Sequence, residues 1–219
     1  MNPFRIVADL SHLASILILL RTIQTTNCID GVSLKTQVLY VLVFVSRYLD
    51  LLTLHWISLY NTLMKVFFIS SSVYIVVLLQ RAKVNNAVGY KEMILRDSFK
   101  IGYLVGASFV LALLFHERFT FIDVAWSFSV WLESIAILPQ LFMLSKSGKA
   151  QSLTIHYIFA LGLYRALYIP NWIWRWLVEN KDFQKLAFVT GVIQTLLYSD
   201  FFYIYYKKVI KGGSVSLPH

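Results

Sequence analysis

The sequence predicts an all-α polytopic membrane protein with seven transmembrane helices. Of its 219 residues, 58% are hydrophobic and 14% are charged, and the mean hydropathy is +0.65. A soluble domain of this length needs far more charged surface. The apolar runs have the length that a transmembrane helix requires, and they lack the alternating pattern of a transmembrane β-barrel. The sole cysteine, Cys28, excludes an intrachain disulfide framework.

Seven apolar runs follow one another along the chain. The first is expected to be a retained span rather than a signal peptide, because it lacks a small-residue cleavage site and stays apolar to Leu20. The second and third adjoin so closely that they are expected to form a tight hairpin. The runs lie at 4–21, 36–54, 56–79, 99–116, 121–143, 152–174 and 184–206.

Basic residues alternate between the two sides of this predicted bundle. Most of the lysines and arginines outside the runs lie in the first, third and fifth connections and in the tail. The positive-inside rule therefore predicts a lumenal N-terminus and a cytosolic C-terminus. The formal net charge of +9 is then explained by cytosolic loops and not by nucleic-acid binding.

An internal repeat predicts how the helices are organised. Residues 31–50 (GVSLKTQVLYVLVFVSRYLD) resemble 149–168 (KAQSLTIHYIFALGLYRALY), and both runs would cross in the same direction. Two parallel three-helix repeats joined by an inverting fourth helix are expected, the plan of SWEET transporters, and Pro139–Gln140 is reminiscent of PQ-loop proteins. The predicted single domain over 1–219 comprises the first repeat (1–79), the linker and fourth helix (80–120), the second repeat (121–206) and a cytosolic tail (207–219).

Charged residues inside the apolar runs indicate a binding site. On insertion scales an ionised residue at mid-bilayer costs about 2.5–3.5 kcal/mol, so such groups usually face a bundle interior or a watery cavity. Arg47, Arg165 and Arg175 lie in apolar runs, as do Asp50 and Glu133. A guanidinium binds a carboxylate through two parallel hydrogen bonds. The excess of positive charge therefore predicts an anionic ligand.

Helical spacing arranges these residues as polar stripes concentrated in the predicted lumenal half. Converging, the stripes would enclose a cavity lined by Arg5, Arg47 and Arg175, which suits a short ligand with several carboxylates. The alternative is that each arginine only pairs with a local acid, for instance Arg47 with Asp50. Arg165 lies off the shared stripe and is expected to be structural. The stripes are Arg5, Asp9 and His12; Tyr40, Arg47 and Asp50; Asp123, Trp126 and Glu133; and Tyr164, Tyr168, Asn171 and Arg175.

His12 is the predicted pH switch. The unperturbed pKa of histidine, about 6.5, lies between the pH values of early and late secretory compartments. A lone histidine on an apolar helix is often only a satisfied core residue. Glu133 and Tyr164 favour the functional interpretation, because a buried acid at similar depth needs a partner and a His–Tyr–Glu hydrogen-bond network would supply one.

The sequence contains no motif of a known enzyme class. There is no H-E-x-x-H, no G-x-S-x-G and no pair of intramembrane aspartates at catalytic spacing. We therefore expect no catalytic residue, no cofactor and no metal site.

Six of the seven runs contain segments characteristic of one family. The segments are NPFRIVADLSHL, SRYLDLLT, ISLYNTLMKV, WLESIAILPQLFMLSK, HYIFALGLYRALYIPNWIWRW and YSDFFYIYYKKVIKG. They resemble the receptors that retrieve escaped lumenal proteins ending in K-D-E-L or H-D-E-L, and are most similar to the fungal members. The resemblance runs nearly end to end, and the loop at 81–100 is its least characteristic part.

The resemblance implies a role for each candidate residue. Arg5, Arg47 and Arg175 would hold the acidic side chains and the terminal carboxylate of the signal. Cargo would bind in the mildly acidic Golgi and leave at the near-neutral pH of the endoplasmic reticulum. Asp50, Asp123 and Trp172 would lie near the fourth residue from the end of the signal, Tyr48, Tyr168 and Asn171 would complete the ligand-binding set, and His12, Tyr164 and Glu133 would form the pH sensor.

The tail and the membranes in which the protein resides follow from the same resemblance. Ligand-induced closure would expose Lys207, Lys208 and Lys211 to the COPI coat, which returns the receptor from the Golgi in retrograde vesicles. Two positions depart from the family: Asp123 stands where many members have glutamate, and Gly213 stands where a further lysine is expected.

A small-molecule transporter of the SWEET or PQ-loop type is the alternative function. The internal repeat and Pro139–Gln140 support it. The arginines speak against it, because they crowd the lumenal half, whereas alternating access places a site near the midplane.

Overall fold

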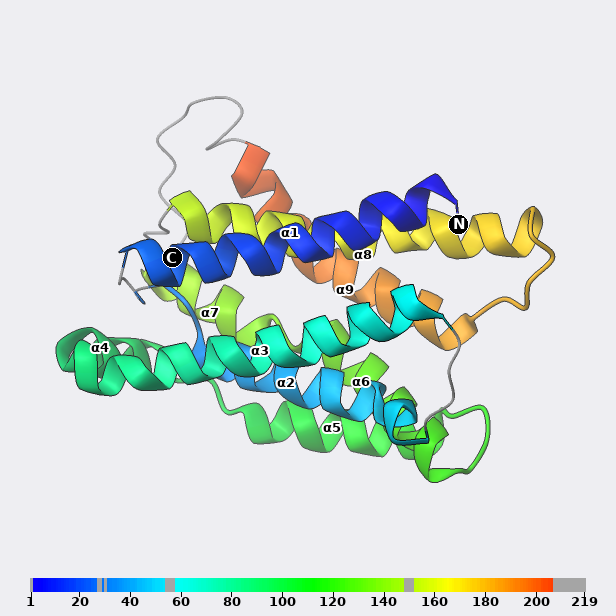
Figure 1. Ribbon diagram of the computed structural model, residues 1–219, viewed down its shortest axis with the longest axis horizontal. Coiled ribbons are helices and arrows are strands. Elements are labelled where there is room, and N and C mark those ends of the chain that lie inside the picture. The colour runs from blue at the N-terminus through cyan, green and yellow to red at the C-terminus, as the bar shows by residue number, and fades with distance from the viewer. Residues whose placement is uncertain (1, 27–28, 30, 54–57, 148–151, 207–219) are drawn as a thin grey trace. The chain divides into compact units, whose positions relative to one another are not determined.

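The computed structural model describes residues 2–26, 29, 31–53, 58–147 and 152–206, and every regular element in these ranges is helical (Figure 1). The all-α class is therefore confirmed. The elements are α1 (Pro3–Thr26), α2 (Leu34–Arg47), the 3₁₀ helix η1 (Leu49–Thr53), α3 (Leu59–Asn85), α4 (Ala87–Arg96), α5 (Ile101–Leu114), α6 (Phe121–Ile135), α7 (Leu138–Ser147), α8 (Ser152–Leu177) and α9 (Lys185–Tyr205).

Several of these helices can cross a membrane. Among the described residues, four segments are long and apolar enough, and the pair α4 and α5, bent by 54°, would supply a fifth span. With 26 residues, α8 is also long enough, but its tyrosines, tryptophans and arginines lower its hydropathy. The chain is thus built as a multi-pass membrane protein, and the count of seven spans stays a prediction. The four segments are Pro3–Thr25, Leu59–Asn85, Phe121–Lys146 and Lys185–Tyr203.

The segment expected as the linker between the third and fourth spans contains a helix. α3 continues to Asn85, and α4 begins immediately after Asn86, whose side chain accepts a hydrogen bond from the Gly89 amide at 3.0 Å. Asparagine is a favoured N-cap residue, so it starts a new helix where the preceding one ends. Met93 is the residue of α4 that is buried. A capping residue and one buried anchor therefore make this basic segment helical.

The run expected as one fifth span is divided into two helices. α6 ends at Ile135 and α7 begins at Leu138, directly before Pro139. Proline lacks an amide hydrogen and its ring crowds the carbonyl four residues earlier, here that of Ile135, so it interrupts the helix. The freed amide of Gln140 donates to Thr36 Oγ1 at 3.1 Å, and Gln140 Oε1 accepts from the Ser33 amide at 2.8 Å. The Pro139–Gln140 pair thus connects the start of α7 to the start of α2.

A second buried contact fixes the beginning of α2. Asp97 is 1% exposed, and its Oδ2 accepts hydrogen bonds from Ser33 Oγ and from the Lys35 amide, each at 2.9 Å. The Lys35 ammonium donates to the Phe99 carbonyl at 2.8 Å. A carboxylate is favourable at the N-terminus of a helix, where free amides point outward. Asp97 therefore joins the end of α4 to the start of α2.

The chain divides into two compact units, which are described separately. In the first unit, α1 lies along α8, and α8 packs on α9 (Figure 1). In the second unit, α6 packs against α2 and α5, and α3 packs against α2 and α4. The parallel repeat predicted from the sequence stays a prediction.

Glycine allows α8 and α9 to approach closely in the first unit. A Cβ atom added to Gly191 would lie 2.6 Å from the Trp172 ring, and one added to Gly162 would lie 2.5 Å from the Tyr198 ring. Small residues commonly permit such close packing of membrane helices. The sequence thereby seats Trp172, a candidate ligand-binding residue, directly against α9.

Candidate ligand-binding site

Arg5 is held at the start of α1 by an acid that also contacts α8. Its Nε lies 3.7 Å from Asp9 Oδ2, one helical turn further along. The Tyr168 hydroxyl donates a hydrogen bond of 2.5 Å to Asp9 Oδ1. The Arg5 side chain is 33% exposed, so it is oriented by Asp9 but remains accessible to a ligand.

A polar cluster surrounds Arg175 at the same end of the first unit. The Asn2 side-chain amide donates to Asn171 Oδ1 at 2.9 Å and to Glu179 Oε1 at 3.3 Å. Glu179 Oε2 lies 3.7 Å from Arg175 Nε, and the Arg175 side chain is 30% exposed. Because Asn2 Oδ1 also accepts from the Arg5 amide at 2.9 Å, this cluster adjoins the Arg5 region. Two accessible arginines therefore share one end of the α1–α8 pair.

Aromatic rings line the face of α8 that carries these residues. The rings of His12 and Tyr164 are nearly parallel, with centroids 4.2 Å apart, and both residues are buried. Tyr164 contacts Tyr168 edge-on at 6.1 Å, and Tyr168 contacts Trp172 at 5.5 Å. Residues four apart on a helix are neighbours, so the three α8 rings form a continuous ladder. His12 stacks on Tyr164, the first of these three rings.

Arg165, on the same helix, contacts two of these rings. Its guanidinium lies 5.9 Å from the Tyr164 ring centroid and 5.6 Å from that of Trp172, and the residue is 5% exposed. Cations are attracted to aromatic faces at such distances. Arg165 therefore contacts two aromatic residues of the candidate site, and its structural role stays a prediction.

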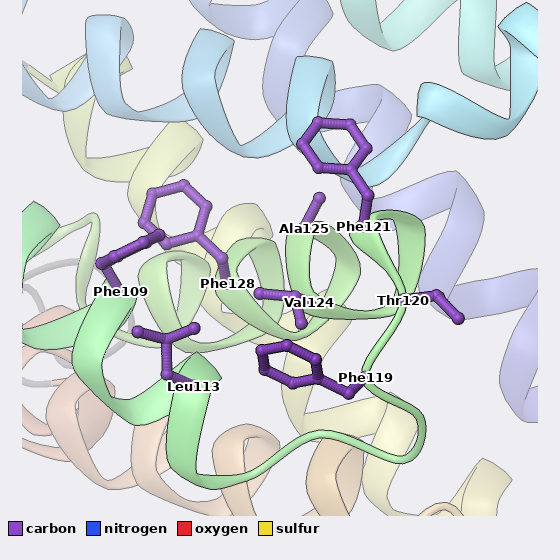
Figure 2. A pocket seen from close by; sticks show the side chains of 8 residues that line it. All are labelled: Phe109, Leu113, Phe119, Thr120, Phe121, Val124, Ala125 and Phe128. Atoms are coloured by element: carbon purple, nitrogen blue, oxygen red, sulfur yellow. The ribbon is translucent and has the colours of Figure 1, made fainter.

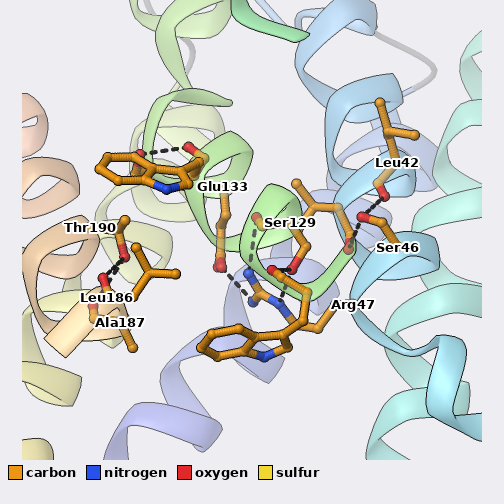
Figure 3. Close-up of polar contacts among 12 residues, drawn as sticks. Leu42, Ser46, Arg47, Ser129, Glu133, Leu186, Ala187 and Thr190 are labelled. Carbon is orange, nitrogen blue, oxygen red and sulfur yellow. Dashed lines mark hydrogen bonds and ion pairs between the residues drawn. The ribbon is translucent and has the colours of Figure 1, made fainter. Parts of the chain in front are cut away.

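Arg47 forms the most buried ion pair of the candidate site, in the second unit. Its Nη1 lies 2.5 Å from Glu133 Oε2, and the Glu133 side chain is 0% exposed. Arg47 Nε donates to Ser129 Oγ and Nη2 donates to the Ser129 carbonyl, both at 3.1 Å (Figure 3). The guanidinium at the end of α2 is thus fixed on α6 by one carboxylate and one serine.

Asp50 pairs with a lysine that the sequence analysis assigned no ligand role. Asp50 Oδ2 and the Lys65 ammonium form a close ion pair between η1 and α3. The same ammonium lies 5.8 Å from the centre of the Tyr48 ring. Asp50 and Tyr48, two candidate ligand-binding residues, therefore share Lys65 as a neighbour.

Asp123 lies in the first turn of α6 and forms a reciprocal contact with the residue that caps this helix. The Thr120 hydroxyl donates to Asp123 Oδ2 at 2.7 Å and accepts from the Asp123 amide at 3.2 Å. A carboxylate three residues after a threonine N-cap is typical of a capping box. Asp123 is thus positioned by the helix start itself.

The candidate residues divide between the two units. The single cavity lined by three arginines stays a prediction, as does a hydrogen-bond network joining His12, Tyr164 and Glu133. The first group comprises Arg5, His12, Tyr164, Tyr168, Asn171, Trp172 and Arg175, and the second comprises Arg47, Tyr48, Asp50, Asp123 and Glu133. The tail lysines Lys207, Lys208 and Lys211 lie outside the described residues.

Several partners in these groups were missed by sequence reasoning. Glu179 follows Arg175 by four residues, a spacing that favours an ion pair on a helix and could have identified it. Asn2 and Ser129 carry no such signal, because uncharged residues near an apolar run are common.

All three candidate arginines contact a carboxylate of the protein itself, and these partners are Asp9, Glu133 and Glu179. A guanidinium has five N–H donors, so one carboxylate does not saturate it. The arrangement can therefore exchange or share carboxylates with an anionic ligand.

Comparison with known proteins identifies the family. The family model of the ER lumen protein retaining receptor matches residues 28–175. An ER lumen protein-retaining receptor of Saccharomyces cerevisiae is 65% identical over 218 residues, and one of Kluyveromyces lactis is 64% identical over 219 residues. ER lumen protein-retaining receptor 2 of Homo sapiens is 49% identical over 221 residues.

These matches extend over the whole molecule. They cover 100% of this chain in each case. They also cover 100% of the Saccharomyces and human relatives and 99% of the Kluyveromyces relative. The names describe a receptor and not an enzyme, which agrees with the motif analysis. The chain belongs to the ER lumen protein-retaining receptor family.

Proposed function

We propose that this chain binds the C-terminal H-D-E-L or K-D-E-L type signal of escaped lumenal proteins. Three arginines, Arg5, Arg47 and Arg175, each contact a carboxylate within the protein, and this observation carries the proposal. The signal presents three carboxylates, from its aspartate, its glutamate and its terminus. Each can replace or join a resident carboxylate at one guanidinium, whose fork favours carboxylate geometry.

Binding proceeds as an exchange of partners. Arg5 and Arg175 are about one-third exposed and loosely paired, so they are suited to make the first contacts with the signal. Arg47 is held more tightly, because Glu133 and Ser129 both contact it. Capture at Arg47 therefore requires a compensating change at Glu133.

A proton provides that compensation. A cargo carboxylate that takes over Arg47 leaves Glu133, which is fully buried, without its cation. An unpaired buried carboxylate is costly, and it becomes neutral by taking up a proton. His12, buried against the Tyr164 ring, offers a second site at which a proton can be taken up. Binding is thus accompanied by proton uptake.

The sign of this coupling follows from linkage. A complex that binds more protons than the free receptor is favoured by acid, so affinity falls as pH rises, by at most about tenfold per pH unit for each linked proton. Cargo is captured in the mildly acidic Golgi and released at the near-neutral pH of the endoplasmic reticulum.

Three residues select the fourth residue from the end of the signal. Asp50 and Asp123 supply carboxylates and Trp172 supplies an indole, and a histidine or lysine side chain suits both kinds of group. Lys65 partly neutralises Asp50, which moderates the preference for a cation.

The chain resides in membranes of the endoplasmic reticulum and Golgi, and it cycles between them with its cargo. Its N-terminus is lumenal and its C-terminus is cytosolic, as the alternation of basic loops indicates. The tail lysines Lys207, Lys208 and Lys211 recruit the COPI coat for the return in retrograde vesicles. The names of the relatives support retention of lumenal proteins and do not favour the transporter alternative.

A peptide-binding curve against pH tests this function. The purified full-length receptor is titrated with a labelled peptide ending in H-D-E-L, and we expect tighter binding at about pH 6 than at about pH 7. Peptides with each of the last four residues changed to alanine serve as matched controls. Affinity that is constant or rises with pH would overturn the proposed mechanism. Solute flux across proteoliposomes would revive the transporter alternative.

A further inference from the structure

An apolar groove lies between α5 and α6, at the end where these helices are joined by the loop 115–120. Figure 2 shows Phe109 and Leu113 on α5 opposite Val124 and Phe128 on α6, with Phe119 of the loop beside them. The groove encloses about 540 Å³. This volume falls in the range of about 300–1,000 Å³ that small-molecule sites occupy.

The groove opens toward the surroundings of the helices. Phe109 is 52% exposed, Phe119 is 78% exposed and Phe121 is 80% exposed. Thr120 is the lining residue with a side-chain hydroxyl, and this hydroxyl is engaged with Asp123. The surface that an occupant contacts is therefore almost entirely hydrocarbon. In a membrane, the acyl chains of lipids are the apolar groups available to fill such a groove.

Charged residues adjoin the groove in the loop between two candidate membrane spans, next to Phe119 and Thr120, which line it. The membrane-spanning segment that contains α6 begins at Phe121, and Glu117 and Arg118 lie a few residues before it, both exposed. Within the described part of the chain, neither side chain has an ion pair or a hydrogen bond. An unpaired arginine and an unpaired acid side by side complement a phosphate and an amine.

We propose that the groove between α5 and α6 binds one acyl chain of a zwitterionic phospholipid whose phosphate contacts Arg118. The amine or choline of the headgroup then lies beside Glu117, while the acyl chain contacts Phe109, Leu113 and Phe128. Arginine suits the phosphate because its planar fork donates two parallel hydrogen bonds to it. None of the candidate arginines lines this groove, and the proposal does not depend on the proposed cargo.

Photolabelling of the purified full-length chain in nanodiscs tests the site. The probe is phosphatidylcholine with a diazirine near the end of one acyl chain, and mass spectrometry of the digested protein locates the label. We expect the label on α5 and α6 residues that line the groove. A dioleoyl-glycerol probe with the same diazirine, which has no phosphate, should label these residues about tenfold less, because the charge-assisted contact is lost.

Two neighbouring leucines give a matched pair of variants. Leu113 lines the groove, whereas Leu114 is 67% exposed and does not. Leu113→Trp should fill the groove and abolish the label there, and Leu114→Trp should leave it unchanged. Arg118→Gln should reduce labelling by phosphatidylcholine to the level of the glycerol probe, and Arg118→Lys should restore part of it. Thermal unfolding of each variant in the same nanodiscs confirms that it is folded.

Three results would overturn the proposal. Equal labelling in the Leu113 and Leu114 variants would show that lipid contacts this surface without a specific site. Equal labelling by the two probes would remove the role of Arg118. Cross-linked dimers through α5 and α6 that disappear in Leu113→Trp would show that a second copy of the chain covers the groove instead.

Discussion

The carboxylate of Glu133 lies 2.5 Å from the guanidinium of Arg47, which joins α6 to α2 across the interior of the second unit. Glu133 is fully buried, and removal of one partner of such a pair commonly costs about 3–5 kcal/mol because the other charge stays buried. In the proposed mechanism, neutralising the charge of Glu133 favours the release of Arg47 to a ligand. Cargo binding and acidity would then both act on this ion pair.

Glu133→Gln imitates the protonated acid and should weaken the dependence of cargo binding on pH. The amide keeps the shape of the carboxylate but cannot take up a proton, so one linked proton is lost. We expect the affinity for an H-D-E-L peptide to change less between about pH 6 and about pH 7, by up to tenfold over that interval. Titration of the peptide into the purified variant at both values measures this change.

Glu92→Gln is the matched control for that variant. Glu92 also forms an ion pair with an arginine, Arg96, at 3.4 Å, but both side chains are about half exposed on α4. Its removal should leave the pH dependence as in the unchanged chain. A Glu133→Gln variant with an undiminished pH dependence would exclude Glu133 as a site of proton uptake.

His12→Phe should weaken cargo binding in acid. Phenylalanine can keep the ring stack on Tyr164, which has a centroid distance of 4.2 Å, but it cannot carry a proton. We expect peptide affinity at about pH 6 to fall by up to about tenfold, because one of the two linked protons is lost. His116→Asn, at the end of α5, provides a control histidine outside the site. An acid enhancement of binding that is undiminished in His12→Phe would show that His12 is only a packed core residue.

Lys65→Gln should sharpen the preference for a cation at the fourth residue from the end of the signal. The substitution removes the ammonium that pairs with Asp50, so more of the negative charge of Asp50 is available to the ligand. The ratio of affinities for H-D-E-L and A-D-E-L peptides should rise at about pH 6, where histidine is largely protonated. Lys91→Gln, on the exposed surface of α4, should leave this ratio unchanged. An unaltered ratio in Lys65→Gln would mean that Asp50 does not face this residue of the signal.

Asp97→Ala should destabilise the fold through the start of α2. The substitution leaves the Ser33 hydroxyl and the Lys35 amide without their acceptor. Each buried donor left unsatisfied costs about 1–3 kcal/mol, so a clear fall in the thermal unfolding temperature is expected. Asp182→Ala, at an exposed position before α9, is the control. If both variants unfolded at the same temperature as the unchanged chain, Asp97 would not anchor α2.

The helical class could be predicted from the sequence because hydrophobicity and helix length are local properties. The start of α8 and the end of α9 agree with the expected runs to within a residue. The break between α6 and α7 was not predicted although Pro139 lies there, because membrane helices often tolerate a proline, so its presence in an apolar run does not by itself indicate a break. α4 was missed because its apolar content is low and its one buried residue, Met93, gives no periodic signal.

The candidate residues could be identified by type, but their partners could not all be predicted. Pairs within one helix, such as Arg5 with Asp9, follow from the four-residue spacing. Arg47 could be expected to pair with Asp50, its nearest acid in the sequence, but its carboxylate partner in the structure is Glu133 on another helix. Long-range pairing depends on how helices pack, and one sequence alone does not contain this information.

The central claim is that arginines of the receptor capture the carboxylates of a C-terminal signal. The most direct test compares two peptides that end in H-D-E-L, one with a free C-terminal carboxylate and one with an amide, for binding to the full-length receptor at about pH 6. The amide removes one charge-assisted contact and leaves every side chain in place. We predict that the free acid binds and that the amidated peptide does not bind measurably. Equal affinities for the two peptides would contradict the account.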